Sequence, residues 1–169
     1  MTPTLQSRQG AGFTIIEMLI ASFLSMVVLA SAWSLFISYQ QIWRETSVHV
    51  EANRIAALGL NRIVYGVGSA PCGLRGAGDA VLTSSGTNGW TLTYSDRSNN
   101  PAGTFRFRGD ARTLTYTPPS GTEQVLAQPV SRSLATIQSN ALTVSVEVDL
   151  TQGRFSSTRE LSTTVRWRN

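Results

Sequence analysis

The chain of 169 residues contains no lysine, one cysteine and one histidine, and these shortages limit the sites it can form. Its fourteen basic residues are all arginines, against ten acidic ones, which gives a formal charge of +4 and a pI of about 10.0. This mild excess suits an acidic partner or a membrane surface and is not typical of a nucleic-acid-binding domain. The single cysteine, Cys72, excludes an intrachain disulfide, and we expect a free thiol in a turn of small residues.

Catalytic and metal-binding patterns are also missing. His49 lies in a predicted helix, and Glu51, two residues further on, does not share its helix face. The sequence has no phosphate-binding loop, no G-x-S-x-G motif and no zinc-ligand spacing. Asp96–Asn100 carries oxygen side chains as calcium loops do, but it lacks their glycine and distant glutamate. We therefore predict no catalytic residue, metal or cofactor. We expect His49 to be a satisfied or solvated residue of the helix surface, and a turn at Asp96 in preference to a calcium site.

Formal charges are absent from Met18 to Trp43, and no proline or glycine interrupts this apolar run. Such a segment is long enough to cross a bilayer as a helix, which satisfies its own backbone hydrogen bonds. Glu17 lies at the leading edge of the apolar stretch, which begins at Phe13. A carboxylate in a membrane segment is costly without a partner, and no basic residue between Phe13 and Trp43 supplies one. The amino terminus of a neighbouring copy, cut before Phe13, is a candidate partner.

The residues from Gly12 to Ala21, GFTIIEMLIA, resemble the processing site of type IV prepilins and pseudopilins. In that family a prepilin peptidase cuts after the glycine on the cytoplasmic side and methylates the new phenylalanine amine. The fifth mature residue is a glutamate. The resemblance implies cleavage between Gly12 and Phe13 and an assembly role for Glu17. It also implies partners: other pilin or pseudopilin subunits, the peptidase, an inner-membrane assembly platform and membrane lipid.

Two other interpretations of the same region stay open. Met18 to Leu29 could be the core of a secretory signal, followed by a small-residue cleavage site and a released domain that starts at Trp33. Against this, Glu17 cancels the charge of Arg8 before the core, and the apolar run continues past the supposed cut. The segment could also be an uncleaved anchor. The arginine distribution does not support a cytoplasmic N-terminus, so the orientation depends on the resemblance.

Beyond the apolar run the sequence becomes amphipathic, with apolar residues at steps of three and four. These residues are Ile42, Ala52, Ile55, Ala56, Leu60, Ile63 and Val67. We predict one helix from Phe13 to about Tyr65, with Gly59 as a weak point that costs about 1 kcal/mol against alanine. The predicted organisation is a cleaved leader (1–12), a membrane and filament-core helix (13–40), an amphipathic half (41–66) and a β head (67–169).

The head is rich in glycine, serine, threonine and asparagine, with short alternating runs. The predicted strands are Trp90–Tyr94, Thr104–Arg108, Thr113–Thr117, Thr122–Ala127, Ala141–Leu150 and Arg159–Arg168. We expect a hairpin across Gly109–Arg112, a turn at Thr151–Thr158, and exposed loops at Gly73–Ala80, Ser95–Gly103 and Pro118–Glu123. The predicted fold class is α+β, in which the long N-terminal helix packs its Ile55–Val67 stripe on one antiparallel sheet. This architecture resembles that of the pilin-like family.

The expected function is that of a structural subunit, without enzymatic activity, of a type IV pilus or a type II secretion pseudopilus. The lack of a C-terminal cysteine pair argues against major pilins closed by a disulfide loop. The final strand and the length resemble the J-type pseudopilin of type II secretion or the W-type minor pilin. Such a subunit would be a single-pass protein of the bacterial inner membrane with a periplasmic head. Two pairs of arginines each share a strand face, Arg106 with Arg108 and Arg166 with Arg168. We expect these faces to be solvated and not to be DNA contacts. The alternative is an anchored or released β-domain that binds a ligand or partner.

Overall fold

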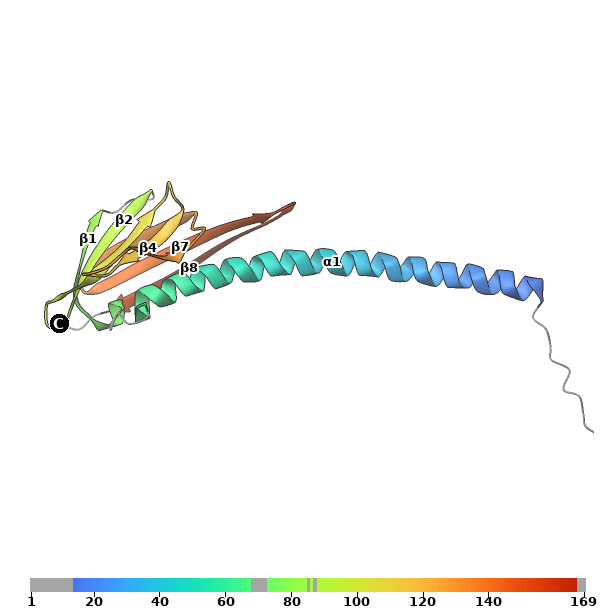
Figure 1. Cartoon of the computed structure of the whole chain (residues 1–169), viewed down its shortest axis with the longest axis horizontal. Coiled ribbons are helices and arrows are strands. Elements are labelled where there is room, and N and C mark those ends of the chain that lie inside the picture. Colours follow the sequence, from blue (N-terminus) through green and yellow to red (C-terminus); the bar gives the residue numbers. More distant parts are fainter. Residues whose placement is uncertain (1–13, 68–72, 85, 87, 167–169) are drawn as a thin grey trace, which may run out of the picture. The chain divides into compact units, whose positions relative to one another are not determined.

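The described part of the chain forms one long helix, one short 3-10 helix and eight strands (Figure 1). The computed structural model describes residues 14–67, 73–84, 86 and 88–166. Helix α1 spans Ile15–Tyr65, so the predicted helix and its end at Tyr65 are confirmed. The chain divides into two compact units between Trp43 and Arg44. We call the second unit, which holds the end of α1 and all the strands, the head.

The part of α1 in the first unit exposes apolar side chains around its whole circumference. No residue of its most apolar stretch is buried, which makes α1 a candidate membrane span by length and composition. Its serine hydroxyls donate to backbone carbonyls three or four residues earlier, at 2.8 to 3.0 Å. These are Ser22, Ser25, Ser31 and Ser38. The helix therefore satisfies these polar groups internally, as a lipid environment requires.

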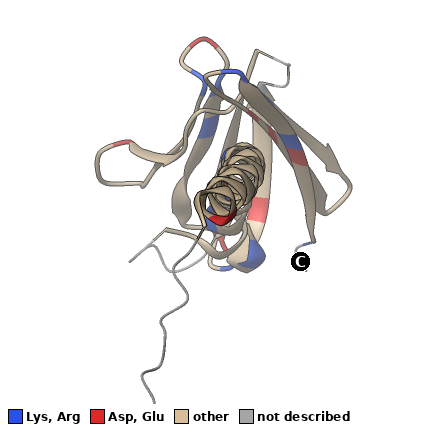
Figure 2. Cartoon of the chain, turned by 90° about the vertical axis from the view of Figure 1, so that its right-hand side faces the viewer, with Lys and Arg blue, Asp and Glu red and all other residues tan. Residues whose placement is uncertain are grey.

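The head contains two antiparallel sheets, where the sequence predicted one. The first has the order β1 (Ala77–Ser84), β2 (Gly89–Asp96), β3 (Pro101–Arg108), β4 (Thr113–Thr117) and β5 (Gln124–Ala127). The second has the order β6 (Arg132–Gln138), β7 (Ala141–Gln152) and β8 (Phe155–Arg166), and a short 3-10 helix, η1 (Leu74–Gly76), precedes β1. In Figure 2 the two sheets diverge, and charged residues are scattered over loops and strands. The predicted α+β fold class, a long N-terminal helix packed on antiparallel strands, is confirmed. Only the number of sheets differs, because the helix presents apolar side chains in more than one direction and each sheet covers part of them.

The second half of α1 contributes small and apolar side chains to the core. Its buried residues are Val48, Ala52, Ala56, Gly59, Leu60 and Ile63. A Cβ atom at Gly59 would lie 3.1 Å from Ala127 Cβ and 3.5 Å from Leu114 Cδ2. The predicted weak point of the helix is therefore a place where the helix approaches the first sheet closely. Ile42, expected in the same apolar stripe, is 62% exposed and lies in the first unit.

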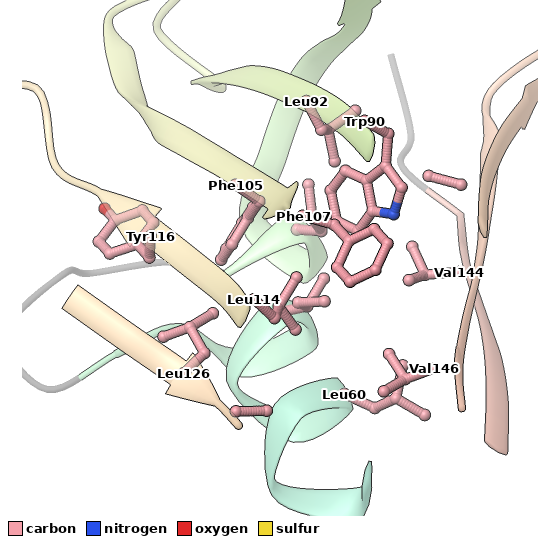
Figure 3. Close-up of a cluster of buried hydrophobic side chains, with 14 of the residues drawn as sticks. Leu60, Trp90, Leu92, Phe105, Phe107, Leu114, Tyr116, Leu126, Val144 and Val146 are labelled. Atoms are coloured by element: carbon pink, nitrogen blue, oxygen red, sulfur yellow. The ribbon is translucent and has the colours of Figure 1, made fainter. Parts of the chain in front are cut away.

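A single apolar cluster joins both sheets to the helix (Figure 3). The alternate residues of β7 are fully buried, as the sequence predicted: Leu142, Val144, Val146 and Val148. From the first sheet, the Trp90 indole Nε1 donates to Ser133 Oγ on β6 at 3.0 Å. Ser133 Oγ then donates to the carbonyl oxygen of Ser145 on β7 at 2.7 Å. This chain of bonds lets a buried polar pair connect the two sheets without an unsatisfied donor.

Several predicted strands are confirmed with shifted ends. The hairpin across residues 109–112 is confirmed, since Arg108 pairs with Thr113 between β3 and β4. The predicted strands at 90–94 and 141–150 are the centres of β2 and β7, and the weak strand predicted at 122–127 is β5. Residues 118–123 are confirmed as a largely exposed connection between β4 and β5.

Other predicted loops are wrong. Leu74 is completely buried, and β1 begins at Ala77, so Gly73–Ala80 is not an exposed loop. The loop predicted at Ser95–Gly103 is only a turn at residues 97–100, between β2 and β3. The last hairpin turns at Gly153 and Arg154, so the turn predicted over Thr151–Thr158 is too long. Strand β6 was not predicted at all. In β1 and β6 the inward positions include alanine and serine, so the alternation of apolar side chains that marks a half-buried strand is weak there.

Candidate functional site

The first turn of α1 is closed by Thr14 and Glu17. The backbone nitrogen of Thr14 donates to Glu17 Oε2 at 2.9 Å, and the Thr14 hydroxyl donates to the same oxygen at 3.0 Å. In return the backbone nitrogen of Glu17 donates to Thr14 Oγ1 at 3.3 Å. This reciprocal arrangement is a capping box, which satisfies donors that a helix N-terminus otherwise leaves free.

The capping box gives Glu17 a partner within its own chain, which the sequence analysis missed. The signal was present, because a threonine three residues before a glutamate at the start of an apolar run is the sequence pattern of this cap. Both donors of Thr14 bind Oε2, so the cap does not occupy Oε1. The predicted processing residues Gly12 and Phe13 lie outside the described residues.

The helix that follows Glu17 differs from a core helix of a globular protein. Ile15 is 80% exposed, Met18 69% and Leu35 72%. A helix that is apolar on every side is normally buried, either in a large core or in a membrane. This part of the chain therefore requires lipid or other helices as its surroundings.

The start of the chain matches one known pattern. Residues 7–33 match the family model of the prokaryotic N-terminal methylation motif. The match supports a type IV pilin-like subunit. It covers Thr14, Glu17 and the first part of the exposed helix, and the architecture of α1 packed on antiparallel strands is pilin-like. No curated protein and no solved structure matches the chain significantly. Pilin-like proteins assemble with other pilin subunits and are processed by prepilin peptidase.

His49 is the satisfied one of the two kinds of helix-surface histidine that the sequence predicted. Its Nδ1 lies 2.5 Å from the Oγ atom of Ser157, so it links α1 to β8. Its Nε2 lies 4.0 Å from Glu45 Oε1, which is too long for a hydrogen bond. Ser157, His49 and Glu45 follow one another in space, in the order of a nucleophile, a base and an acid. However, Ser157 is only 3% exposed. The contact therefore serves to hold the helix against the strand, and a substrate would not reach this hydroxyl.

Asp96 is confirmed as a turn former. Its Oδ1 accepts hydrogen bonds from the backbone nitrogens of Ser98 at 2.8 Å and Asn100 at 2.9 Å. These bonds, the one from Asn100 first, hold the pKa of Asp96 below its ordinary value. Within the described part of the chain, no group of three or more histidine, cysteine, aspartate or glutamate residues could hold a metal ion. Cys72 lies outside the described residues.

The two arginines on β3, Arg106 and Arg108, have different surroundings. Arg108 forms an ion pair with Glu123, and the Thr115 hydroxyl donates to the other oxygen of that carboxylate at 2.7 Å. Thr115 first, and then Arg108, lower the pKa of Glu123. Arg106 is exposed on the same strand face. Arg108 is therefore committed to an intramolecular contact. In the other pair, Arg166 ends β8 as an exposed residue and Arg168 lies outside the described residues.

Proposed function

We propose that the chain is a structural subunit of a type IV pilus or a type II secretion pseudopilus, of the minor pilin or pseudopilin kind. The observation that carries this proposal is the methylation-motif match over residues 7–33, which leads directly into an exposed apolar helix. The proposed precursor is cut between Gly12 and Phe13 and methylated at Phe13. The mature subunit then waits in the inner membrane, crossing it once with its head in the periplasm, until an assembly platform draws it into a filament.

Glu17 is the proposed determinant of docking. When apolar helices leave lipid and pack on one another, the apolar contribution nearly balances, because lipid tails are as apolar as leucine. A polar pair can then decide which position a new subunit takes. In the proposed mechanism, Thr14 holds one carboxylate oxygen of Glu17, and the other oxygen receives the amine of a neighbouring subunit's Phe13.

The subtype follows from weaker features. The absence of a C-terminal cysteine pair and the long final strand favour a minor subunit similar to the J-type pseudopilin or the W-type minor pilin. The alternative function is an anchored or released β-domain that binds a ligand. The mature N-terminus separates the two, because methylated Phe13 supports the filament subunit, whereas a chain beginning at Trp33 or Met1 supports the alternative. Gly12→Asp should leave the precursor uncut.

The assembly role of Glu17 is tested by replacing it with glutamine and with alanine. Glutamine at the third helical position still completes a capping box but carries no charge, whereas alanine loses both. If charge pairing drives docking, Glu17→Gln and Glu17→Ala are both inserted and cleaved, and both assemble poorly. The measurements are the mass of the mature protein and its amount in sheared filaments or pseudopili.

Two results would contradict this mechanism. Normal incorporation of Glu17→Gln together with loss of Glu17→Ala would mean that Glu17 acts only as a helix cap. Normal incorporation of both variants would remove Glu17 from assembly altogether. Thr14→Ser is the matched control, because serine preserves the hydroxyl of the cap.

A further inference from the structure

The edges of the two sheets differ in how they are closed. Strand β1, at one edge of the first sheet, has two register shifts against β2. Strand β5, at the other edge, has only four residues, and Arg62 of α1 donates to its Leu126 carbonyl oxygen at 2.8 Å. Strand β6, at one edge of the second sheet, lies close to β1 and β2. Bulges, short strands and covering elements are the usual means by which proteins keep an edge from pairing with another chain.

Strand β8, at the remaining edge, is neither short nor bulged. It pairs with β7 without interruption from Phe155 to Arg166, and it contains no proline or glycine. Within the described part of the chain, no strand pairs with its other edge. Its charged residues are Arg159, Glu160 and Arg166, which are of both signs. Such a mixture selects a partner strand of matching charge and does not exclude pairing altogether.

A groove of about 260 Å³ lies between the edge of β8 and the part of α1 that belongs to the head. Residues 161–163 line it from β8, Ala57 and Asn61 are among the helix residues opposite, and none of the lining residues is charged. Because successive side chains of a strand point to opposite faces, a groove lined by three consecutive residues runs along the edge of the strand. On its other side α1 packs closely on β5, where Gly59 approaches Ala127. The head is therefore closed between α1 and β5 and open between α1 and β8.

The charges in the second sheet indicate what could lie beside β8. Glu160 is directly opposite Glu147 of β7, and like charges in this position are destabilising. Glu147 has a basic neighbour, because Arg132 of β6 is directly opposite it on the other side. Glu160 is exposed and has no ion pair with any described residue. A basic residue on a strand added beside β8 would give Glu160 the opposite charge that Glu147 already has.

The other residues of the edge specify the rest of such a strand. Leu161 and Val165 share the face of β8 that packs on the core, so apolar residues opposite them would extend that core. Arg166 is exposed on the same face as Glu160, so an acidic residue suits the position opposite it. Strand β8 has this same pattern when it is paired antiparallel with itself about Thr163. Glu160 is then opposite Arg166, and Leu161 is opposite Val165, so a peptide copy of β8 is a suitable probe.

We propose that β8 binds an extended strand of a partner protein as an antiparallel fourth strand of the second sheet. The partner strand carries a basic residue opposite Glu160, apolar residues opposite Leu161 and Val165, and an acidic residue opposite Arg166. Its backbone hydrogen bonds supply affinity and these side chains supply specificity, as in other proteins that bind a peptide at a sheet edge. This inference goes beyond the proposed function, because it concerns the head alone and needs neither cleavage nor methylation at Phe13.

The test measures disulfide formation between the full chain in detergent and a peptide probe. The chain carries Cys72→Ser and Ser162→Cys, and the peptide copies residues 160–166 with cysteine in place of Thr164. Antiparallel pairing about Thr163 places the two cysteines directly opposite each other, close enough for a disulfide. The control peptide has its first and last residues exchanged, so its composition is unchanged but it sets like charges opposite Glu160 and Arg166.

The amount of mixed disulfide at equilibrium in a glutathione buffer is measured by mass spectrometry. We expect about five-fold or more with the copied peptide than with the control peptide, since two opposite-charge pairs replace two like-charge pairs. The same exchange in the chain, Glu160→Arg with Arg166→Glu, should reverse the preference. Near-ultraviolet circular dichroism checks that each variant keeps its core.

Each result decides the proposal without reference to the mature N-terminus. Equal mixed disulfide with both peptides, or a preference that does not reverse in the exchanged chain, overturns the strand contact. Disulfide dimers that form between Ser162→Cys and Thr164→Cys chains without peptide would assign the edge to a second copy and also overturn a different partner. Because the measurement uses the unprocessed chain, it stands even if the proposed cleavage before Phe13 proves wrong.

Discussion

Thr14 and Glu17 show how one pair of residues can close a helix end and still leave one carboxylate oxygen outside the cap. The cap uses Oε2 of Glu17 and both donors of Thr14. The sequence alone suggested that Glu17 lacked a partner, and the structure supplies one three residues away. A second copy is therefore not needed to explain the carboxylate. In the proposed function a second copy pairs with the charge of Glu17, which glutamine would remove without removing the cap.

At the same scale, Glu123 predicts a pH dependence in the head. Because its pKa is lowered in the folded protein, its contacts stabilise the fold fully above its ordinary pKa of 4.5. The stabilisation is lost as the pH falls through the lower folded value. Thr115→Val removes the largest cause of the shift, so the pKa of Glu123 should rise. The loss of stability between pH 7 and pH 3 should then become smaller.

The measurements for this prediction are the titration of the Glu123 carboxyl signal by nuclear magnetic resonance and urea unfolding at both pH values. Thr117→Val is the matched control, since it makes the same change further along β4. A Glu123 pKa that is equal in Thr115→Val and the parent chain would show that the hydroxyl does not hold the carboxylate. Glu123 is about one-third exposed, so we expect a modest effect on stability.

At the scale of elements, the sequence predicted most accurately those helices and strands in which one pattern of apolar residues continues over many positions. The helix α1 follows from an uninterrupted apolar run and an amphipathic continuation, and β7 follows from strict alternation. Strands β1 and β6 were missed because their buried positions include small residues, Ala77 and Ala80 in β1 and Ser133 and Ala135 in β6. Burial at such positions depends on partners from distant strands, such as Trp90 for Ser133, and these are not visible in a local pattern.

The candidate site was predicted less completely than the helix that carries it. The apolar run and the position of Glu17 were evident from the sequence, but the reciprocal bonds with Thr14 were not inferred. His49 was expected to be a surface residue because its contact, Ser157, lies far along the chain. Long-range pairs of this kind require the register between β8 and α1, which no local spacing determines. The close approach of Gly59 to Ala127 was not foreseen for the same reason.

The packing of α1 on the sheets predicts different costs for two nearby leucines. Leu60 is 7% exposed and lies close to Val146 in the core (Figure 3), whereas Leu58 is 39% exposed on another face of the helix. Leu60→Ala should lower the free energy of unfolding by about 2–4 kcal/mol, from lost burial and a residual cavity. Leu58→Ala should lower it by less than about 1 kcal/mol. Urea unfolding of the two detergent-solubilised variants, followed by near-ultraviolet circular dichroism, measures the difference. Equal decreases in the free energy of unfolding of the two variants would mean that the helix packs on the sheets through a different face.

At the scale of the whole molecule, the two units have opposite requirements. The first exposes apolar side chains on all sides and can be satisfied only by lipid or by other helices. The second buries its apolar side chains in one cluster of its own and carries nearly all of the charge. In the proposed function, this division lets the surroundings of the first unit change from membrane to filament while the second unit keeps its fold. The second unit nevertheless needs residues 44–65 of α1, because they supply part of its core.

That dependence predicts where the chain can be shortened. Val48, Leu60 and Ile63 are each less than 10% exposed, and burial of three such side chains contributes about 5–9 kcal/mol. This is comparable with the whole stability of a small domain, about 5–15 kcal/mol. A chain that starts at Arg44 should therefore fold and stay monomeric in the absence of detergent, whereas one that starts at Gly66 should fail to fold. Gel filtration and near-ultraviolet circular dichroism distinguish the two. A folded chain from Gly66 would mean that the sheets form a core without the helix, and aggregation of the chain from Arg44 would mean that the head depends on the apolar segment.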